Sequence, residues 1–111
     1  MLTAEEREVL ELVVEDYYGL WEIVWRLENV FGPYPNSAAG EAARIVEGLR
    51  SHGLVTLWVR EWTDDEPLPL GQTGHVVNLR NPSTWAVPPP DQHQILITAT
   101  ELGRGELATR S

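Results

Sequence analysis

The chain has 111 residues, of which 42% are hydrophobic and 23% are charged, and this is enough for one globular domain with a single modest core. It contains no cysteine, which excludes disulfides and thiolate metal sites, and its longest apolar run is far below the roughly 18 residues that a membrane-spanning helix needs. The formal net charge is −9, and all the basic residues are arginines.

Acidic residues are spread unevenly along the chain. Residues 1–28 have a net charge of −6, residues 61–90 of −3 and residues 91–111 of −1, whereas residues 29–60 have a net charge of +1. This one stretch lacks an acidic excess, but its charge is too small to make a basic patch. The start, MLTAEERE, is acidic and lacks the basic and apolar regions of a signal peptide, so we expect a cytoplasmic protein.

Two helices are predicted in the first third of the chain. A capping-box pattern at Thr3, followed by apolar residues at helical spacing, predicts a helix over about 4–17, and a second apolar stripe predicts a helix over about 20–31. Trp21 and Trp25 lie four residues apart on an adjoining face of this helix. Such a pair is more often a core or dimer contact than a ligand site. The residues predicted to enter the core from these helices are Val9, Val13, Tyr17, Ile23, Val24 and Leu27.

A third helix and a strand follow the turn GPYPNS. Ser37 can cap a helix over about 37–52, and Gly53 stands where a left-handed residue is expected to end it. The segment LVTLWVREW then alternates with period two, which predicts a strand over 54–62. The residues predicted to face the core are Ile45, Val46, Leu49, Val55, Leu57 and Val59, and the outer face of the strand carries Thr56, Trp58, Arg60 and Trp62.

Weaker patterns fill the rest of the chain. Residues 63–93 are rich in Pro, Asp and Gly, with a short strand expected at 75–79 and a one-turn helix at NPSTW, where asparagine can cap a helix that begins with proline. QILITAT predicts a strand over 94–100, which we expect to pair antiparallel with the strand over 54–62. The last 11 residues are expected to form a frayed tail. The order of these elements predicts an α+β fold in a single domain.

This order of elements resembles the winged helix-turn-helix family. ARIVEGLRSHGLV (43–55) is similar to the end of the family's recognition helix and the start of its wing, and ITATELGR (97–104) is similar to its second wing strand with the Thr-x-x-Gly-Arg step. GLWEIVWRLENVFG (19–32) resembles the helix before the turn in the PadR-like and MarR-like branches. The resemblance implies a three-helix core, a small antiparallel β-wing and an extended wing connection at about 63–93.

The chain differs from the family pattern in two respects. About 30 residues separate the predicted wing strands, where a few are usual. The tail after Gly103 is also shorter than the terminal helix through which PadR-like and MarR-like proteins dimerise. Most members of the family bind DNA, whereas many others bind proteins.

For DNA, the resemblance implies that the third helix enters the major groove with its N-terminal residues toward the base edges. Arg44 could then read guanine and Ser37 could contact phosphate, whereas Glu41 would repel the backbone unless it accepted from a cytosine. The predicted DNA-binding residues are Ser37, Gly40, Glu41, Arg44, Arg50, Arg60 and Arg80. Three or four phosphate contacts would give a monomer poor affinity, although a dimer could be adequate.

The predicted function is thus a DNA-binding transcriptional regulator, and the alternative is an acidic winged helix that binds a protein and no DNA. For the alternative, the candidate partner surface is Trp58, Trp62 and Trp85. We expect NPSTWAVPPP to fold back over the outer face of the sheet or to reach a second subunit in a homodimer, because two bare tryptophans would invite association.

Enzyme chemistry is not expected. His52, His75 and His93 have no spacing typical of metal ligands, and GQTG is too short for a phosphate-binding loop. We therefore predict no cofactor and no metal site, and we expect the histidines to lie at the surface or in loops.

Overall fold

The first half of the chain forms three helices. The structure, a computed structural model, describes residues 2–34, 37–61, 66–89 and 92–108. In these residues α1 spans Ala4–Val13, α2 spans Leu20–Phe31 and α3 spans Ala38–Ser51, so the predicted second and third helices are confirmed to within one residue. No helix in these ranges is long and apolar enough to cross a membrane.

Local capping groups set the helix ends. The backbone N–H of Thr3 donates to Glu6 Oε1 at 2.9 Å and the N–H of Glu6 donates to Thr3 Oγ1 at 3.1 Å, which is the predicted capping box. The hydroxyl of Ser37 accepts the N–H of Gly40 at 3.1 Å and so caps α3. At the other end of α3, Gly53 has a φ of 73°, the left-handed conformation predicted for it.

The first helix is shorter than predicted. α1 ends at Val13, and Asp16 Oδ1 accepts the N–H of Tyr17 at 2.7 Å, a local bond that competes with the helix. Tyr18 then pairs with Ile97 in an extended conformation. Tyr17 is therefore 36% exposed, and the prediction that it enters the core is wrong, because its neighbour Tyr18 takes the side of the chain that packs inward.

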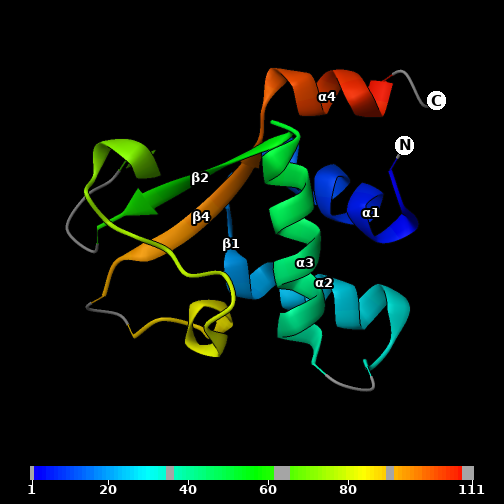
Figure 1. Cartoon of the computed structure of the whole chain (residues 1–111), viewed down its shortest axis with the longest axis horizontal. Helices are drawn as coiled ribbons and strands as arrows, with labels where there is room; N and C mark the ends of the chain where they lie inside the picture. The colour runs from blue at the N-terminus through cyan, green and yellow to red at the C-terminus, as the bar shows by residue number, and fades with distance from the viewer. Residues whose placement is uncertain (1, 35–36, 62–65, 90–91, 109–111) are drawn as a thin grey trace.

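The strands form one antiparallel sheet. β1 spans Tyr18–Gly19, β2 spans Val55–Arg60, β3 spans Leu68–Pro69 and β4 spans Gln94–Ala99, in the order β1-β4-β2-β3. β2 pairs with β4 from Val55↔Ala99 to Arg60↔Gln94, which confirms the predicted pairing. Figure 1 shows α1, α2 and α3 together on one side of this long pair, so the architecture is α+β with the helices over one face of the sheet.

The core lies between the helices and the inner face of the sheet. On β2 the buried residues Val55, Leu57 and Val59 alternate with the half-buried Thr56, Trp58 and Arg60, as predicted. Most of the predicted helix positions are also confirmed; Val24 is the exception besides Tyr17, since it is only partly buried. The confirmed core positions of the helices are Val9, Val13, Ile23, Leu27, Ile45, Val46 and Leu49.

The long connection between β2 and β4 is built differently from the prediction. The strand lies at Leu68–Pro69, followed by a 3-10 turn at Leu70–Gln72, and residues 75–79 form no strand. The one-turn helix at Pro82–Trp85 is confirmed, with Asn81 as its cap. This helix packs against α2 and α3 and not over the outer face of the sheet, so the prediction that it covers Trp58 is wrong.

The end of the chain also differs from the prediction. Residues Glu101–Ala108 form a helix, α4, which runs back from β4 toward α1 (Figure 1). The Thr100 hydroxyl accepts the N–H of Gly103 at 3.1 Å and donates to the Gly53 carbonyl at 2.6 Å. These two bonds fix the first turn of α4, so the prediction of a frayed tail is wrong for residues 101–108.

Candidate functional site

Four of the predicted DNA-binding residues lie together on the first two turns of α3. Ser37, Gly40 and Arg44 are exposed and Glu41 is half-buried. The Ser37 hydroxyl is already used as the helix cap, and the Gly40 N–H is its donor. The groups that could meet a ligand on these turns are therefore the Arg44 guanidinium and the Glu41 carboxylate.

Arg44 is engaged by two carboxylates of its own chain. Its Nη2 lies 2.9 Å from Glu41 Oε2 and 3.6 Å from Glu5 Oε1, and its Nε donates to Glu41 at 3.2 Å. The hydrogen bond with Glu41 raises the pKa of the Arg44 guanidinium above its ordinary value. The cation at the centre of the α3 surface is thus partly neutralised before any ligand arrives.

Arg50 and Arg80 lie beyond Arg44 on the same surface, and acidic side chains accompany them as well. Arg80 Nη2 lies 3.1 Å from Glu47 Oε1, and Arg50 is exposed beside them in a shallow hollow that Glu47, Arg50 and Arg80 line together. Three arginines and three glutamates therefore lie together on and around α3. The α3 surface, defined by its charged residues, consists of Glu5, Glu41, Arg44, Glu47, Arg50 and Arg80.

Arg60 does not join this surface. It pairs with Gln94 on the outer face of the sheet, opposite the face that packs against α3, and its Nε is buried without a hydrogen-bond partner among the described residues. The structure therefore brings six of the seven predicted DNA-binding residues to α3 and its flank and leaves the seventh on another face.

The three tryptophans predicted as a partner surface do not share one face. Trp58 lies on the outer face, where its Nε1 donates to Thr98 Oγ1 at 2.8 Å and its ring meets that of Tyr17 edge-on at 5.2 Å. Trp85 is only 5% exposed, and its Nε1 donates to the Leu79 carbonyl at 2.7 Å, so it belongs to the core and is not available to a partner. Trp62 lies outside the described residues.

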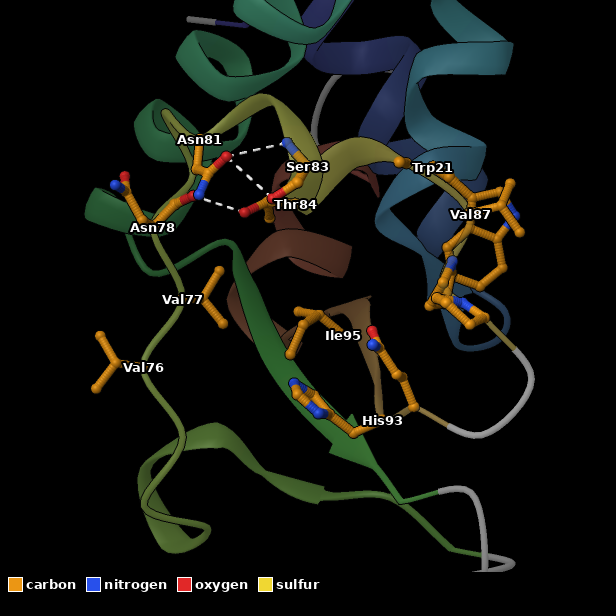
Figure 2. A pocket seen from close by; sticks show the side chains of 14 residues that line it. Trp21, Val76, Val77, Asn78, Asn81, Ser83, Thr84, Val87, His93 and Ile95 are labelled. Atoms are coloured by element: carbon orange, nitrogen blue, oxygen red, sulfur yellow. Dashed lines mark hydrogen bonds between the residues drawn. The ribbon is translucent and has the colours of Figure 1, made fainter.

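A different pair of tryptophans, one exposed and one half-buried, lies on α2. Trp25 of α2 is 57% exposed, and Trp21, one turn earlier, lines a cavity of about 420 Å³ together with Val87 of the connection (Figure 2). Glu28 continues this side of the helix and has no arginine partner in the part of the chain that the structure describes. We call Trp21, Trp25, Glu28 and Val87 the α2 face. The helical spacing of the tryptophans indicated a shared face, but not whether another element covers it.

A second cluster brings together residues that the sequence keeps apart. Glu61 follows β2, His75 follows the 3-10 turn and His93 precedes β4, yet one ligand atom from each lies within 4.8 Å of the others. His75 Nε2 lies 2.8 Å from Glu61 Oε1, and the two imidazole rings are 4.3 Å apart with an interplanar angle of 32°. This His–Glu cluster has the donor set of a metal site, which the sequence spacing did not reveal because no two of its members are neighbours in the chain.

The α3 surface, the α2 face and the His–Glu cluster are thus the three candidate sites. The first is electrically balanced, the second is aromatic and acidic, and the third offers two imidazoles and a carboxylate. No protein family, curated protein or solved structure matches this chain.

Proposed function

We propose that the chain is a winged helix domain that binds a basic protein surface through its α2 face, and that it does not act as a DNA-binding regulator. Support for the winged helix comes from the order of the elements: three helices packed together, then two antiparallel strands, β2 and β4, joined by a long connection. The resemblance of the sequence to that family implied the same order.

The observation that carries the proposal is the charge balance of the α3 surface. DNA affinity depends on arginines and lysines that neutralise phosphates and release counterions. Here Arg44 and Arg80 are held by carboxylates that would themselves face the phosphates, and Arg50 alone lacks such a bond among the described residues. A duplex on this surface would meet as many negative as positive groups, so its binding would gain little from electrostatics.

The α2 face has the composition that a protein partner requires. Exposed tryptophan is among the residues that contribute most at protein interfaces, and an indole face also attracts a guanidinium or ammonium group. Glu28 adds a negative charge on the same side of the helix, and the chain as a whole carries −9. Charge complementarity therefore favours a partner whose surface presents arginine or lysine beside an apolar residue.

Selection from a library of displayed random peptides on the immobilised chain tests this proposal. Recovered peptides should be enriched in arginine or lysine next to an apolar residue, and Trp25→Ala should weaken their binding by more than about 1 kcal/mol. Leu102→Ala, which removes a similarly exposed apolar side chain from α4, away from the cavity of the α2 face, serves as the matched control and should leave binding unchanged. Peptides that bind the Trp25→Ala chain equally well would overturn the assignment of the α2 face.

The DNA alternative is decided by fluorescence anisotropy with genomic duplexes at about 50 mM salt, where nonspecific binding is strong. The wild-type chain should not bind, whereas the double variant Glu41→Gln, Glu47→Gln should gain weak, salt-sensitive binding, because Arg80 loses its carboxylate and Arg44 keeps only the longer contact with Glu5. Tight binding by the wild type that Arg44→Ala reduces by about 1–3 kcal/mol would establish the regulator instead. A dimer in sedimentation velocity that Trp25→Ala dissociates would identify a second copy of the chain as the partner.

A further inference from the structure

We propose that Glu61, His75 and His93 bind one divalent transition-metal ion of the Zn²⁺ class, which fastens the long connection to the end of the sheet. This site is independent of the proposed protein-binding function.

The sheet register explains why two of the three ligands meet. Val59 pairs with Ile95 on the inner face and Arg60 pairs with Gln94 on the outer face, so the next position, where Glu61 and His93 follow, continues the inner face. At this end of the sheet the connection passes close to the inner face, where Val77 lines the same cavity as Ile95 and His93 (Figure 2). Glu61 and His93 are thus presented side by side to the connection.

A fixed turn brings the third ligand to the other two. Gly74 has a φ of 78°, and the His75 N–H donates to Thr73 Oγ1 at 3.2 Å, while the same hydroxyl donates to the Leu70 carbonyl at 2.8 Å. These contacts set the direction of the backbone at His75. Its imidazole then lies between Glu61 and the ring of His93.

The distances fit a metal ion after a small adjustment. Zn–N and Zn–O bonds of about 2.0–2.1 Å put the ligand atoms of a tetrahedral site about 3.4 Å apart. The three ligand atoms here lie within 4.8 Å of one another, so closure needs movements on the order of 1 Å. The His75 and Glu61 side chains are 32% and 42% exposed, so they can move and an ion can reach them.

The donor set selects the kind of metal. Two imidazoles and one carboxylate suit zinc and its transition-metal neighbours, whereas Ca²⁺ and Mg²⁺ prefer oxygen ligands alone. No arginine pairs with Glu61 in the described ranges, so no guanidinium competes with a metal ion for the carboxylate. Three protein ligands leave a fourth position for water beside the cavity that His93 lines.

The test uses the full chain without any affinity tag, titrated with Zn²⁺ by calorimetry and with Co²⁺ by visible absorption. One ion should bind per chain, and Co²⁺ should develop the absorption bands of a site with nitrogen ligands. His75→Ala, His93→Ala and Glu61→Gln should each weaken binding at least tenfold. His52→Ala is the matched control, because His52 is an exposed histidine at the end of α3 and lies outside the cluster. Its removal should leave the affinity for Zn²⁺ and Co²⁺ unchanged.

A thermal measurement gives a second readout. Zn²⁺ at about 100 times its dissociation constant should raise the melting temperature of the wild type and of His52→Ala by about 10 °C, and that of the three site variants much less. Circular dichroism in chelator establishes that the variants are folded. Failure of the wild type to bind Zn²⁺ at millimolar concentration would overturn the proposal and reduce the cluster to a Glu–His hydrogen bond beside a ring contact. Zn²⁺ affinities of His75→Ala and His93→Ala equal to that of the wild type would also overturn it.

Discussion

Tyr34 shows how one side chain ties two distant segments together. Its hydroxyl donates to Glu5 Oε2 of α1 at 2.8 Å, across the turn that precedes α3. Burial and, secondarily, this hydrogen bond to a carboxylate raise the pKa of Tyr34 to about 12 from the ordinary 10.0. Both causes favour the neutral phenol, so the folded protein holds this proton more firmly than the unfolded chain does.

The raised pKa predicts a loss of stability in alkali. Below pH 10 the phenol is neutral in both states and its contribution is fully present; between about pH 10 and 12 only the unfolded chain releases the proton, and the contribution is lost. Tyr34→Phe should therefore cost about 1 kcal/mol of unfolding free energy at neutral pH, and this difference should shrink as the pH approaches 12. Urea unfolding of the wild type and of Tyr34→Phe, from neutral pH to about pH 12, measures this difference in unfolding free energy.

Tyr17→Phe is the control for this measurement, because it removes a phenol that makes no contact with Glu5. Absorption at alkaline pH should still show the late-titrating phenol in Tyr17→Phe and should lose it in Tyr34→Phe. A difference between wild type and Tyr34→Phe that grows above pH 10 would contradict the assignment.

At the scale of elements, the packing of α4 depends on a close contact between its backbone and the residue that precedes β2. Gly103 lies against the backbone of Leu54, and a Cβ at this position would collide with the Leu54 carbonyl oxygen. Gly105, half a turn further on, has open space around the same position. Alanine substitutions at the two positions therefore separate the effect of helix propensity from the effect of packing.

Gly103→Ala should lower the unfolding free energy by about 1–3 kcal/mol, because α4 must shift away from the backbone of Leu54 to accommodate the methyl group. Gly105→Ala should instead be neutral or stabilise the protein by up to about 1 kcal/mol, because alanine favours the helix and meets nothing. Urea denaturation of both variants measures the difference. Equal effects of the two substitutions would show that α4 is not packed against Leu54.

At the scale of the whole molecule, the long connection is part of the core. Leu79 and Trp85 are buried with the residues of α2 and α3, and the Trp85 indole is fixed by its bond to the Leu79 carbonyl. A flexible wing loop would make no such contacts. The connection thus extends the hydrophobic core beyond the three helices and the sheet.

Trp85→Ala should accordingly cost about 3–5 kcal/mol of unfolding free energy, the range for loss of a buried aromatic side chain. Trp25→Ala removes the same side chain from an exposed position and should cost less than about 1 kcal/mol. Chemical denaturation followed by circular dichroism compares the two. A small effect of Trp85→Ala would mean that the connection is only loosely attached.

The sequence by itself determined those features that depend on near neighbours. The capping box at Thr3, the cap at Ser37, the left-handed Gly53 and the turn at Asn81 each involve groups within a few residues, so their chemistry can be read along the chain. Periodicity likewise placed α2, α3, β2 and β4 and nearly all of their core residues, because one face of a helix or strand recurs at a fixed spacing.

Only the tertiary structure decided the features that depend on distant residues. The pairing of Tyr18 with Ile97 ended α1 early, and contact with Leu54 ordered α4. The ion pair of Arg44 with Glu5 and the meeting of Glu61, His75 and His93 join residues far apart in the sequence. Such contacts are set by strand register and by the path of the connection. A sequence pattern shows which face a residue occupies, but the folded chain alone determines what lies opposite it.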